Sequence, residues 1–200
     1  MWRKVAARNR QIAISIGNSM IPEDDGKAAH LTGLRIPSIR FPATDGTTVD
    51  LSDGGLTVVY AYPRTSPATG GAIEGWDAIP GARGCTPQSC AFRDHFAELK
   101  ALGVERLFGL STQDTEYQKE AANRLHLPFP LLSDKDLHLA QALNLPLFTA
   151  GGMTLLKRLT MIISGQLIEH VFYPVFPPDR NASDVIDWLS TRKALTSSSG

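Results

Sequence analysis

Short apolar runs alternate along this chain with segments of helix length, and this alternation constrains the fold more than any other feature. The runs at 56–62, 104–111 and 128–132 have the length and composition of buried strands. Amphipathic segments follow them, and we expect helices at 87–102, 115–125 and 135–143 and a last helix from Ser183 onward. Strands that alternate with such helices form crossover units. The pattern therefore predicts an α/β fold with parallel strands in its sheet.

Two hairpins are predicted beside this alternation. Residues 36–41 and 47–51 alternate between apolar and polar side chains on either side of an Asp-Gly turn. Residues 155–164 and 166–172 read as a second pair of strands, joined by a Ser-Gly turn.

The 200 residues suit one domain, which we place at 31–195. Residues 1–30 are interpreted as an extension that needs no fixed structure. A transit-type targeting segment is the alternative, because basic residues crowd the start and the first acidic residue is Glu23. Residues 196–200 are expected to be a flexible polar tail.

The composition excludes several classes of protein. Twenty basic residues balance 20 acidic ones, so the chain lacks the basic field of a nucleic-acid-binding protein. Its apolar share of 42% is too high for a disordered chain. The longest apolar runs fall far short of the ~18 residues that a membrane span needs.

Two cysteines are too few for a disulfide-stapled secreted domain or a cysteine-rich zinc site. They stand close together, at positions 85 and 90, and in a cytoplasmic protein, which we expect this to be, such a pair indicates a redox or catalytic role before a structural one. Thr86 and Pro87 predict the N-cap and first position of a helix. Cys85 then lies where the helix dipole and free N–H groups stabilise a thiolate. We therefore expect Cys85 to be a nucleophile, whereas nothing so clearly activates Cys90.

The spacing of the two cysteines differs from that of a Cys-x-x-Cys motif. In an intact helix these positions are separated by about 7.5 Å of rise and about 140° of rotation. A disulfide needs Cα atoms about 4.4–6.8 Å apart. A bond between Cys85 and Cys90 therefore requires the first helical turns to unwind, which suits oxidation of one thiol followed by rescue by the other. The alternative is a pair of buried, inert thiols.

A thiolate that attacks a peroxide also needs donors for the breaking O–O bond, and arginine supplies a fixed fork of them. Arg158 stands at the start of the apolar run 158–163 and is the candidate. Spacing alone does not select it over Arg64, Arg83 or Arg93. A solvated arginine at a strand edge is the plainer interpretation.

Several motifs follow one another in order: an Asp-Gly turn before VDL (49–51), VVYAYPR (58–64), GCTPQSCAFRDHFAELKALGV (84–104), GLST (109–112), LPFPLLSD (127–134) and RLTMIISGQLIEHVF (158–172). Together they resemble the peroxiredoxins of the Q type, also called bacterioferritin comigratory proteins, over residues 31–188. The resemblance implies a thioredoxin-like fold, with a central mixed sheet flanked by helices and a peroxiredoxin N-terminal hairpin.

The resemblance also implies an activity. Cys85 matches the peroxidatic cysteine, Cys90 the resolving cysteine and Arg158 the active-site arginine of the family. The implied reaction is reduction of hydrogen peroxide and organic hydroperoxides without a metal, haem or flavin cofactor. An intramolecular disulfide would be recycled by thioredoxin or a similar dithiol, in a monomer or homodimer.

The chain departs from the family at one loop, which there reads Pro-x-x-x-Thr-x-x-Cys. Ala82 stands in the place of the threonine, and residues 68–83 resemble an insertion. The hydroxyl that orients the peroxide is then expected from Thr65, Ser66 or Thr86, with the first two favoured.

Alternatives remain open for the insertion and for the function. Trp76 either helps to pin the insertion to the body or forms part of a subunit or reductant-docking surface. The protein is alternatively a redox-sensing or partner-binding protein whose peroxidase activity the insertion weakens. A disulfide reductase of the thioredoxin class is a further alternative, against which the missing Cys-x-x-Cys motif argues.

Overall fold

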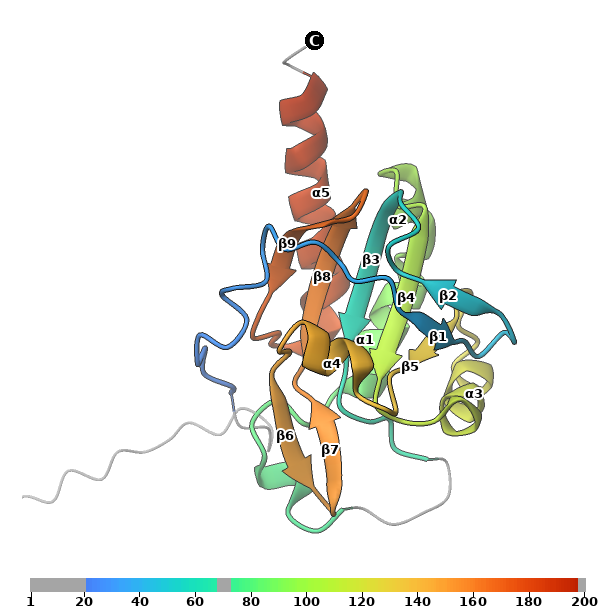
Figure 1. The fold of residues 1–200 in the computed structure, drawn as a ribbon, viewed down its shortest axis with the longest axis vertical. Helices are drawn as coiled ribbons and strands as arrows, with labels where there is room; N and C mark the ends of the chain where they lie inside the picture. Colours follow the sequence, from blue (N-terminus) through green and yellow to red (C-terminus); the bar gives the residue numbers. More distant parts are fainter. Residues whose placement is uncertain (1–20, 68–72, 198–200) are drawn as a thin grey trace, which may run out of the picture.

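The computed structural model describes residues 21–67 and 73–197, and a mixed five-stranded sheet lies at its centre (Figure 1). Across the sheet the strands are β5 (Leu131–Ser133), β4 (Arg106–Ser111), β3 (Leu56–Ala61), β8 (Leu159–Ser164) and β9 (Leu167–Phe172). β3, β4 and β5 run parallel, whereas β8 and β9 each pair antiparallel with their neighbours. The predicted α/β architecture with a central mixed sheet is confirmed.

β3 holds the central place that its uncharged composition predicts. Successive residues of a strand point to opposite faces of the sheet. Val58 and Tyr60 accordingly belong to one hydrophobic cluster, and Val59 and Ala61 belong to another. Both faces of the strand are therefore covered.

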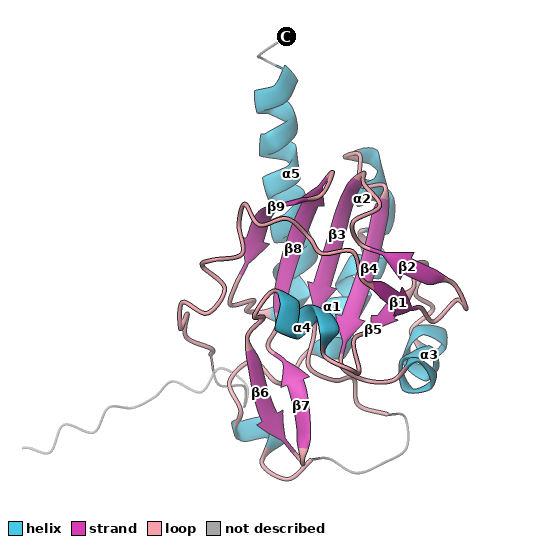
Figure 2. Cartoon of the chain, viewed as in Figure 1, coloured by secondary structure: helices cyan, strands magenta, loops and turns pink. Residues whose placement is uncertain are grey.

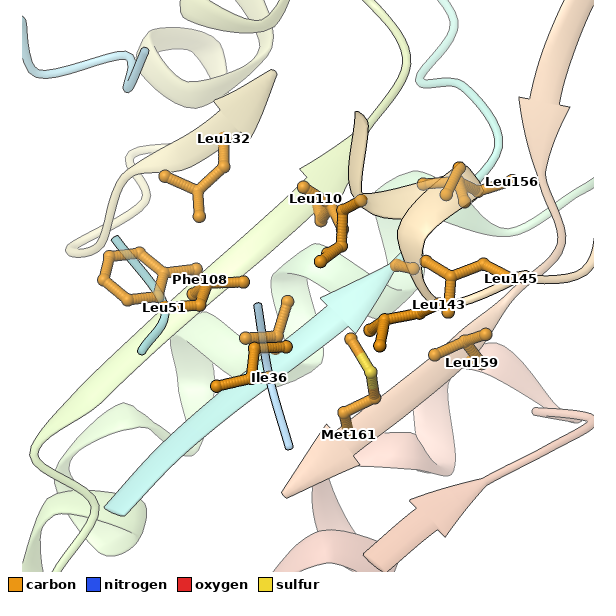
Figure 3. Packing of buried hydrophobic residues seen from close by; sticks show 14 of the residues in the cluster. Ile36, Leu51, Phe108, Leu110, Leu132, Leu143, Leu145, Leu156, Leu159 and Met161 are labelled. Atoms are coloured by element: carbon orange, nitrogen blue, oxygen red, sulfur yellow. The ribbon is translucent and has the colours of Figure 1, made fainter. Parts of the chain in front are cut away.

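Helices and a hairpin cover the two faces (Figure 2). On one face lie α1 (Cys85–Asp94), α2 (Phe96–Ala101) and α5 (Asn181–Ser197), whose apolar side chains pack with those of β3. On the other lie α4 (His138–Ala142) and the predicted hairpin, which consists of β1 (Arg40–Pro42) and β2 (Thr48–Asp50). Figure 3 shows this second cluster, which includes Ile36 and Leu51 together with Leu110 and Met161 of the sheet.

α3 (Thr115–Arg124) packs beside β5 at the edge of the sheet. It begins where the carboxylate of Asp114 accepts a hydrogen bond of 2.7 Å from the backbone N–H of Tyr117. Its bounds agree with the predicted helix at 115–125 to within one residue.

The predicted helix at 87–102 is wrong in its start and in its continuity. It begins at Cys85 rather than after Thr86, because Gly84 takes the N-cap position with a left-handed φ of 99°. It is also interrupted at His95, which leaves the helical region of φ and ψ and separates α1 from α2. Cys85 is therefore the first residue of the helix and not the residue before its cap.

Several other elements differ from their predicted bounds, and the strand predicted at 128–132 is found as β5 at Leu131–Ser133. The strand expected at 155–164 is broken before β8, because its first part forms a separate hairpin of β6 (Leu147–Ala150) and β7 (Met153–Leu156). The helix expected at 135–143 starts only at His138, since Leu137 has a positive φ of 60°. The last helix starts at Asn181, directly after the short helix η2 (Pro178–Arg180).

Part of the expected N-terminal extension packs against the domain. Ala28 is buried in the cluster beneath α4, and the His30 ring lies 2.9 Å from the carbonyl oxygen of Leu143. Residues 1–20 of the extension lie outside the described residues. In the part that is described, none of the helices has the length and apolar character needed to cross a membrane.

Candidate active site

Cys85 opens α1 at the carboxyl end of β3, after the long loop that contains the insertion. Its side chain is buried, with an exposed fraction of 3%. Gly84 is required before it, because a Cβ at this position would lie 2.5 Å from Cγ of Pro178 in η2. The glycine thus lets the start of α1 pack against η2. The sulfur lies at the positive end of the helix dipole, which stabilises an anion by up to about 2 kcal/mol in a partly buried site.

Arg158 reaches the same sulfur from the start of β8. Its Nη2 atom lies 3.2 Å from Sγ of Cys85 and 3.0 Å from the carbonyl oxygen of Arg83. The Cys85 thiol also contacts the carbonyl oxygen of Ala82 at 3.7 Å. A hydrogen bond from a charged donor contributes about 1.5–3 kcal/mol, which is more than the helix dipole usually gives. The Cys85 sulfur therefore has a charged donor beside it and the positive end of a helix dipole behind it.

The structure distinguishes Arg158 from the other arginines that the sequence left open. Arg158 is buried, whereas Arg83 is exposed and pairs with Asp77 at 3.4 Å. Arg64 lies over the ring of Tyr117, and Arg93 pairs with the neighbouring Asp94. None of these three has a recorded contact with the Cys85 sulfur.

Gln88 is a site residue that the sequence reasoning missed. Its Oε1 atom accepts a hydrogen bond from Nη1 of Arg158, and its Nε2 atom donates one of 2.9 Å to Oδ1 of Asn181. The side chain is fully buried one turn after Cys85. A polar residue at helical spacing from the nucleophile is a signal that was available, but the sequence does not indicate its partners.

Cys90 lies in the same intact helix as Cys85, and both thiols are free. Cys90 is half-buried. Next to it, the hydroxyl of Tyr60 donates to Oγ of Ser89 at 3.0 Å. Burial raises the pKa of Tyr60, so this hydroxyl stays protonated and remains a donor. Because α1 is one continuous helix, Cys85 and Cys90 lie five positions apart along it, which is too far for a disulfide.

The three candidate hydroxyls lie in different surroundings. Thr65 is buried, and its Oγ1 atom has no hydrogen-bond partner among the described residues. Ser66 is exposed, and Thr86 is half-buried in the first turn of α1. A buried hydroxyl without a protein partner is uncommon, which distinguishes Thr65 from the other two candidates.

A cavity of about 450 Å³ adjoins Arg158. Its walls are largely apolar and include Pro63, Ile79 from the insertion and Phe148 from β6. Nε of Arg158 is buried without a partner among the described residues. The arginine therefore contacts both the Cys85 sulfur and a space of suitable size for a small organic molecule.

The segment 21–25 forms another wall of this cavity and is tethered to it. The carboxylate of Asp25 accepts hydrogen bonds of 2.7 Å from Nζ of Lys157 and from the hydroxyl of Tyr173. The bond from Lys157, followed by that from Tyr173, holds the pKa of Asp25 well below its usual range. Asp25 is therefore a carboxylate at neutral pH and can accept both hydrogen bonds.

The insertion packs on the β6–β7 hairpin. Trp76, in the short helix η1 (Trp76–Ala78), is half-buried, and its ring lies 6.2 Å from that of Phe148. This contact agrees with the simpler hypothesis, in which Trp76 pins the loop to the body. Residues 68–72 of the insertion lie outside the described residues. A docking role for Trp76 stays a prediction.

The residues of the described ranges include no group of three or more His, Cys, Asp or Glu side chains placed to hold a metal ion. The chemistry that the site offers on its own is that of a buried thiol beside a fixed guanidinium.

Comparisons with a family model and with known sequences identify relatives of this chain. A family model described as Redoxin matches residues 31–186. The chain is 30% identical over 158 residues to the chloroplastic peroxiredoxin Q of Populus jackii, covering 78% of this chain and 66% of the relative. It is 31% identical over 159 residues to peroxiredoxin Bcp of Escherichia coli K12, covering 76% of this chain and 91% of the relative. The chain thus spans just under two thirds of the plant relative.

Solved structures agree with the fold. Peroxidoxin BcpB from Mycobacterium tuberculosis has 26% identity and a TM-score of 0.64, with 81% of this chain and 98% of that chain covered. A PrxQ variant from Xylella fastidiosa has 19% identity and a TM-score of 0.66, with 82% and 98% covered. These matches confirm the predicted thioredoxin-like fold.

Proposed function

This chain belongs to the peroxiredoxin family, and on that premise we propose that it is a thiol peroxidase that reduces hydrogen peroxide and organic hydroperoxides. The observation that carries the proposal is the buried Cys85 sulfur at the start of α1, 3.2 Å from Nη2 of Arg158. A thiolate is the nucleophilic form of cysteine, and both neighbours favour it. The same guanidinium is a donor for the oxygen on which charge develops as a peroxide bond breaks.

The first step oxidises Cys85. Its thiolate attacks the terminal oxygen of ROOH, so that an S–O bond forms as the O–O bond breaks. The bonding electron pair leaves with the RO fragment, which takes the proton that the thiol released and departs as ROH. The protein is left with a sulfenic acid at Cys85.

The second and third steps return the enzyme to its starting state. The Cys90 thiol attacks the sulfenic sulfur, a disulfide forms and water leaves. An external dithiol, proposed to be thioredoxin, then reduces the disulfide to two thiols and becomes a disulfide itself. Because α1 keeps the cysteines apart, its first turns must unwind before the second step.

The role of Cys90 is tested by Cys90→Ser. This variant is expected to consume one equivalent of hydrogen peroxide at the wild-type rate, because Cys90 has no part in the first step. Turnover with thioredoxin is expected to fall to background, since no disulfide forms. Stopped-flow oxidation and a steady-state assay measure the two effects. Full thioredoxin-dependent turnover by the variant would assign the resolving role elsewhere.

Ala82 stands where the family has a threonine, and we propose that Thr65 supplies the hydroxyl that orients the peroxide instead. Its buried oxygen has no partner among the described residues. Thr65→Val keeps the shape and removes the hydroxyl. We expect the rate constant for the first step to fall about tenfold, the size of one lost hydrogen bond. The stability to urea should not fall, since Oγ1 of Thr65 makes no hydrogen bond among the described residues. Ser66→Ala, at an exposed position, is the control. Equal rates for Thr65→Val and wild type would contradict this role.

The cavity beside Arg158 supports organic hydroperoxides as substrates, with their apolar part against Pro63, Ile79 and Phe148. We further propose a cytoplasmic protein, where thiols remain reduced, acting as a monomer or homodimer. The division into an extension (1–30), a domain (31–195) and a tail (196–200) is part of the same proposal. In the structure α5 continues to Ser197, which lies beyond the proposed end of the domain at 195.

An assay with thioredoxin, its reductase and NADPH tests the proposal as a whole. Sustained NADPH oxidation that depends on added hydroperoxide supports the peroxidase. Oxidation of Cys85 followed by no recycling would favour the redox-sensing alternative. Reduction of insulin disulfides without peroxide would favour a disulfide reductase.

A further inference from the structure

A continuous chain of buried polar side chains connects β8, α5 and α1 behind the reactive cysteine. Oγ1 of Thr160 donates a hydrogen bond of 2.6 Å to Oδ1 of Asn181. The same oxygen accepts the bond of 2.9 Å from Nε2 of Gln88, whose Oε1 atom accepts from Arg158. All four side chains are buried, and they come from three separate segments of the sequence.

The hydrogen-bond donors and acceptors of these four side chains determine which amide atom of Gln88 faces each partner. Arginine has only donors, so Gln88 must present its oxygen to Arg158. The amide nitrogen of Gln88 then needs an acceptor, and Oδ1 of Asn181 supplies it. The amide nitrogen of Asn181 is buried with no partner among the described residues. The oxygen of Asn181 is therefore the part of that side chain that the network uses.

The network also connects α1 to the rest of the domain. Gln88 lies between Cys85 and Cys90, in the turns that must unwind before a disulfide forms. Asn181 is the first residue of α5, and Gln88 joins it to Arg158, which stands directly before β8. When α1 unwinds, the bonds of Gln88 to Asn181 and Arg158 must break. While they hold, α1 is kept in the arrangement that places Cys85 beside Arg158.

We infer that Asn181 is a positioning residue: through Gln88 it holds Arg158 and α1 in the form that reacts with peroxide, and it opposes the form that makes the disulfide. The inference rests on the proposed function. Loss of the Asn181 oxygen should change the two chemical steps in opposite directions, which is not expected if Asn181 only stabilises the fold. Oxidation of Cys85 should slow, and the following disulfide step should quicken.

The test follows both steps in the full chain after mixing with hydrogen peroxide, by rapid quenching, thiol alkylation and mass spectrometry. In Asn181→Leu, which has similar volume and no acceptor, we expect oxidation of Cys85 to slow about tenfold, as for one lost buried hydrogen bond. The disulfide between Cys85 and Cys90 should then form several times faster. Asn181→Asp keeps the acceptor and should stay near wild type in both steps.

Two further variants keep the test decisive. Thr160→Val disturbs the same buried site but leaves the bond between Asn181 and Gln88, so it should not produce the opposite changes. If Asn181→Leu does not fold, Gln88→Leu removes the same bond from the other side and should also speed the disulfide step. Slowing of both steps together, or an unchanged ratio of the two rates, would overturn the inference.

The wild-type protein separates this inference from the proposed function. If wild-type Cys85 does not react with peroxide, the peroxidase proposal fails, and the role of Asn181 fails with it. If the wild type completes both steps and Asn181→Leu changes neither, only the role of Asn181 fails.

Discussion

Cys85→Ser is expected to abolish the consumption of hydroperoxides. A serine hydroxyl stays protonated beside Arg158 at neutral pH, and it cannot form the sulfenic acid that the cycle requires. The loss should be complete in both a single-turnover and a steady-state experiment, and peroxide should disappear no faster than without protein. Because serine is close to cysteine in size, the buried position at the start of α1 should still be filled.

The matched control for this variant is Cys90→Ser, which changes the second thiol of the same helix and should keep the first turnover. Urea denaturation of Cys85→Ser establishes that it is folded. Peroxide consumption by Cys85→Ser at a rate near wild type would move the chemistry to another residue and contradict the proposed site.

Arg158→Lys is expected to have the second largest effect. Lysine keeps the positive charge but loses the planar fork that reaches Cys85, Gln88 and the carbonyl oxygen of Arg83 at once. Loss of one preorganised donor at a reacting oxygen typically costs a factor of about 10²–10³. We expect a fall of that size in the rate constant for Cys85 oxidation, measured by stopped flow over a range of peroxide concentrations.

Arg83→Lys is the control for this prediction. Arg83 is exposed, and its ion pair with Asp77 at 3.4 Å is of the kind that contributes little. Its backbone carbonyl, which contacts Arg158, is unaffected by the substitution. The control should stay within about twofold of wild type, as expected for an exposed side chain. Equal losses in the two variants would contradict a specific role for the planar guanidinium of Arg158 beside Cys85.

The sequence predicts the place of Cys85 because the signals are local. An uncharged strand, a glycine and a helix follow one another within one stretch of chain, and the helix N-terminus is a physical reason for thiolate chemistry. The exact start of the helix is less predictable. Gly84 takes a left-handed φ that Thr86 and Pro87 do not reveal, so the helix begins earlier than their capping preferences predict.

The choice of Arg158 depends on sheet pairing, which no local pattern specifies. β8 runs antiparallel to β3, and Leu159 pairs with Ala61. The start of one strand therefore lies at the end of the other, which brings Arg158 close to the start of α1, where Cys85 lies. For the same reason the partnership of Gln88 with Asn181, 93 positions apart, is visible only in the folded protein.

Two predicted elements were continuous in the sequence but are divided in the structure. His95 leaves the helical region without a proline or glycine to mark it, so the division between α1 and α2 has no clear local signal. The run at 155–164 is apolar on both sides of Lys157 and Arg158, and periodicity does not reveal that its two parts pair with different strands. Tertiary pairing overrides local pattern in the second case.

The most direct test of the account is the mass of the reduced protein before and after one equivalent of hydroperoxide, with the cysteine-containing peptides mapped. We expect a loss of two hydrogen atoms and a cross-link between Cys85 and Cys90, formed through a sulfenic acid that a trapping reagent captures on Cys85 alone. An unchanged mass, or oxidation of Cys90 while Cys85 stays a free thiol, would contradict it.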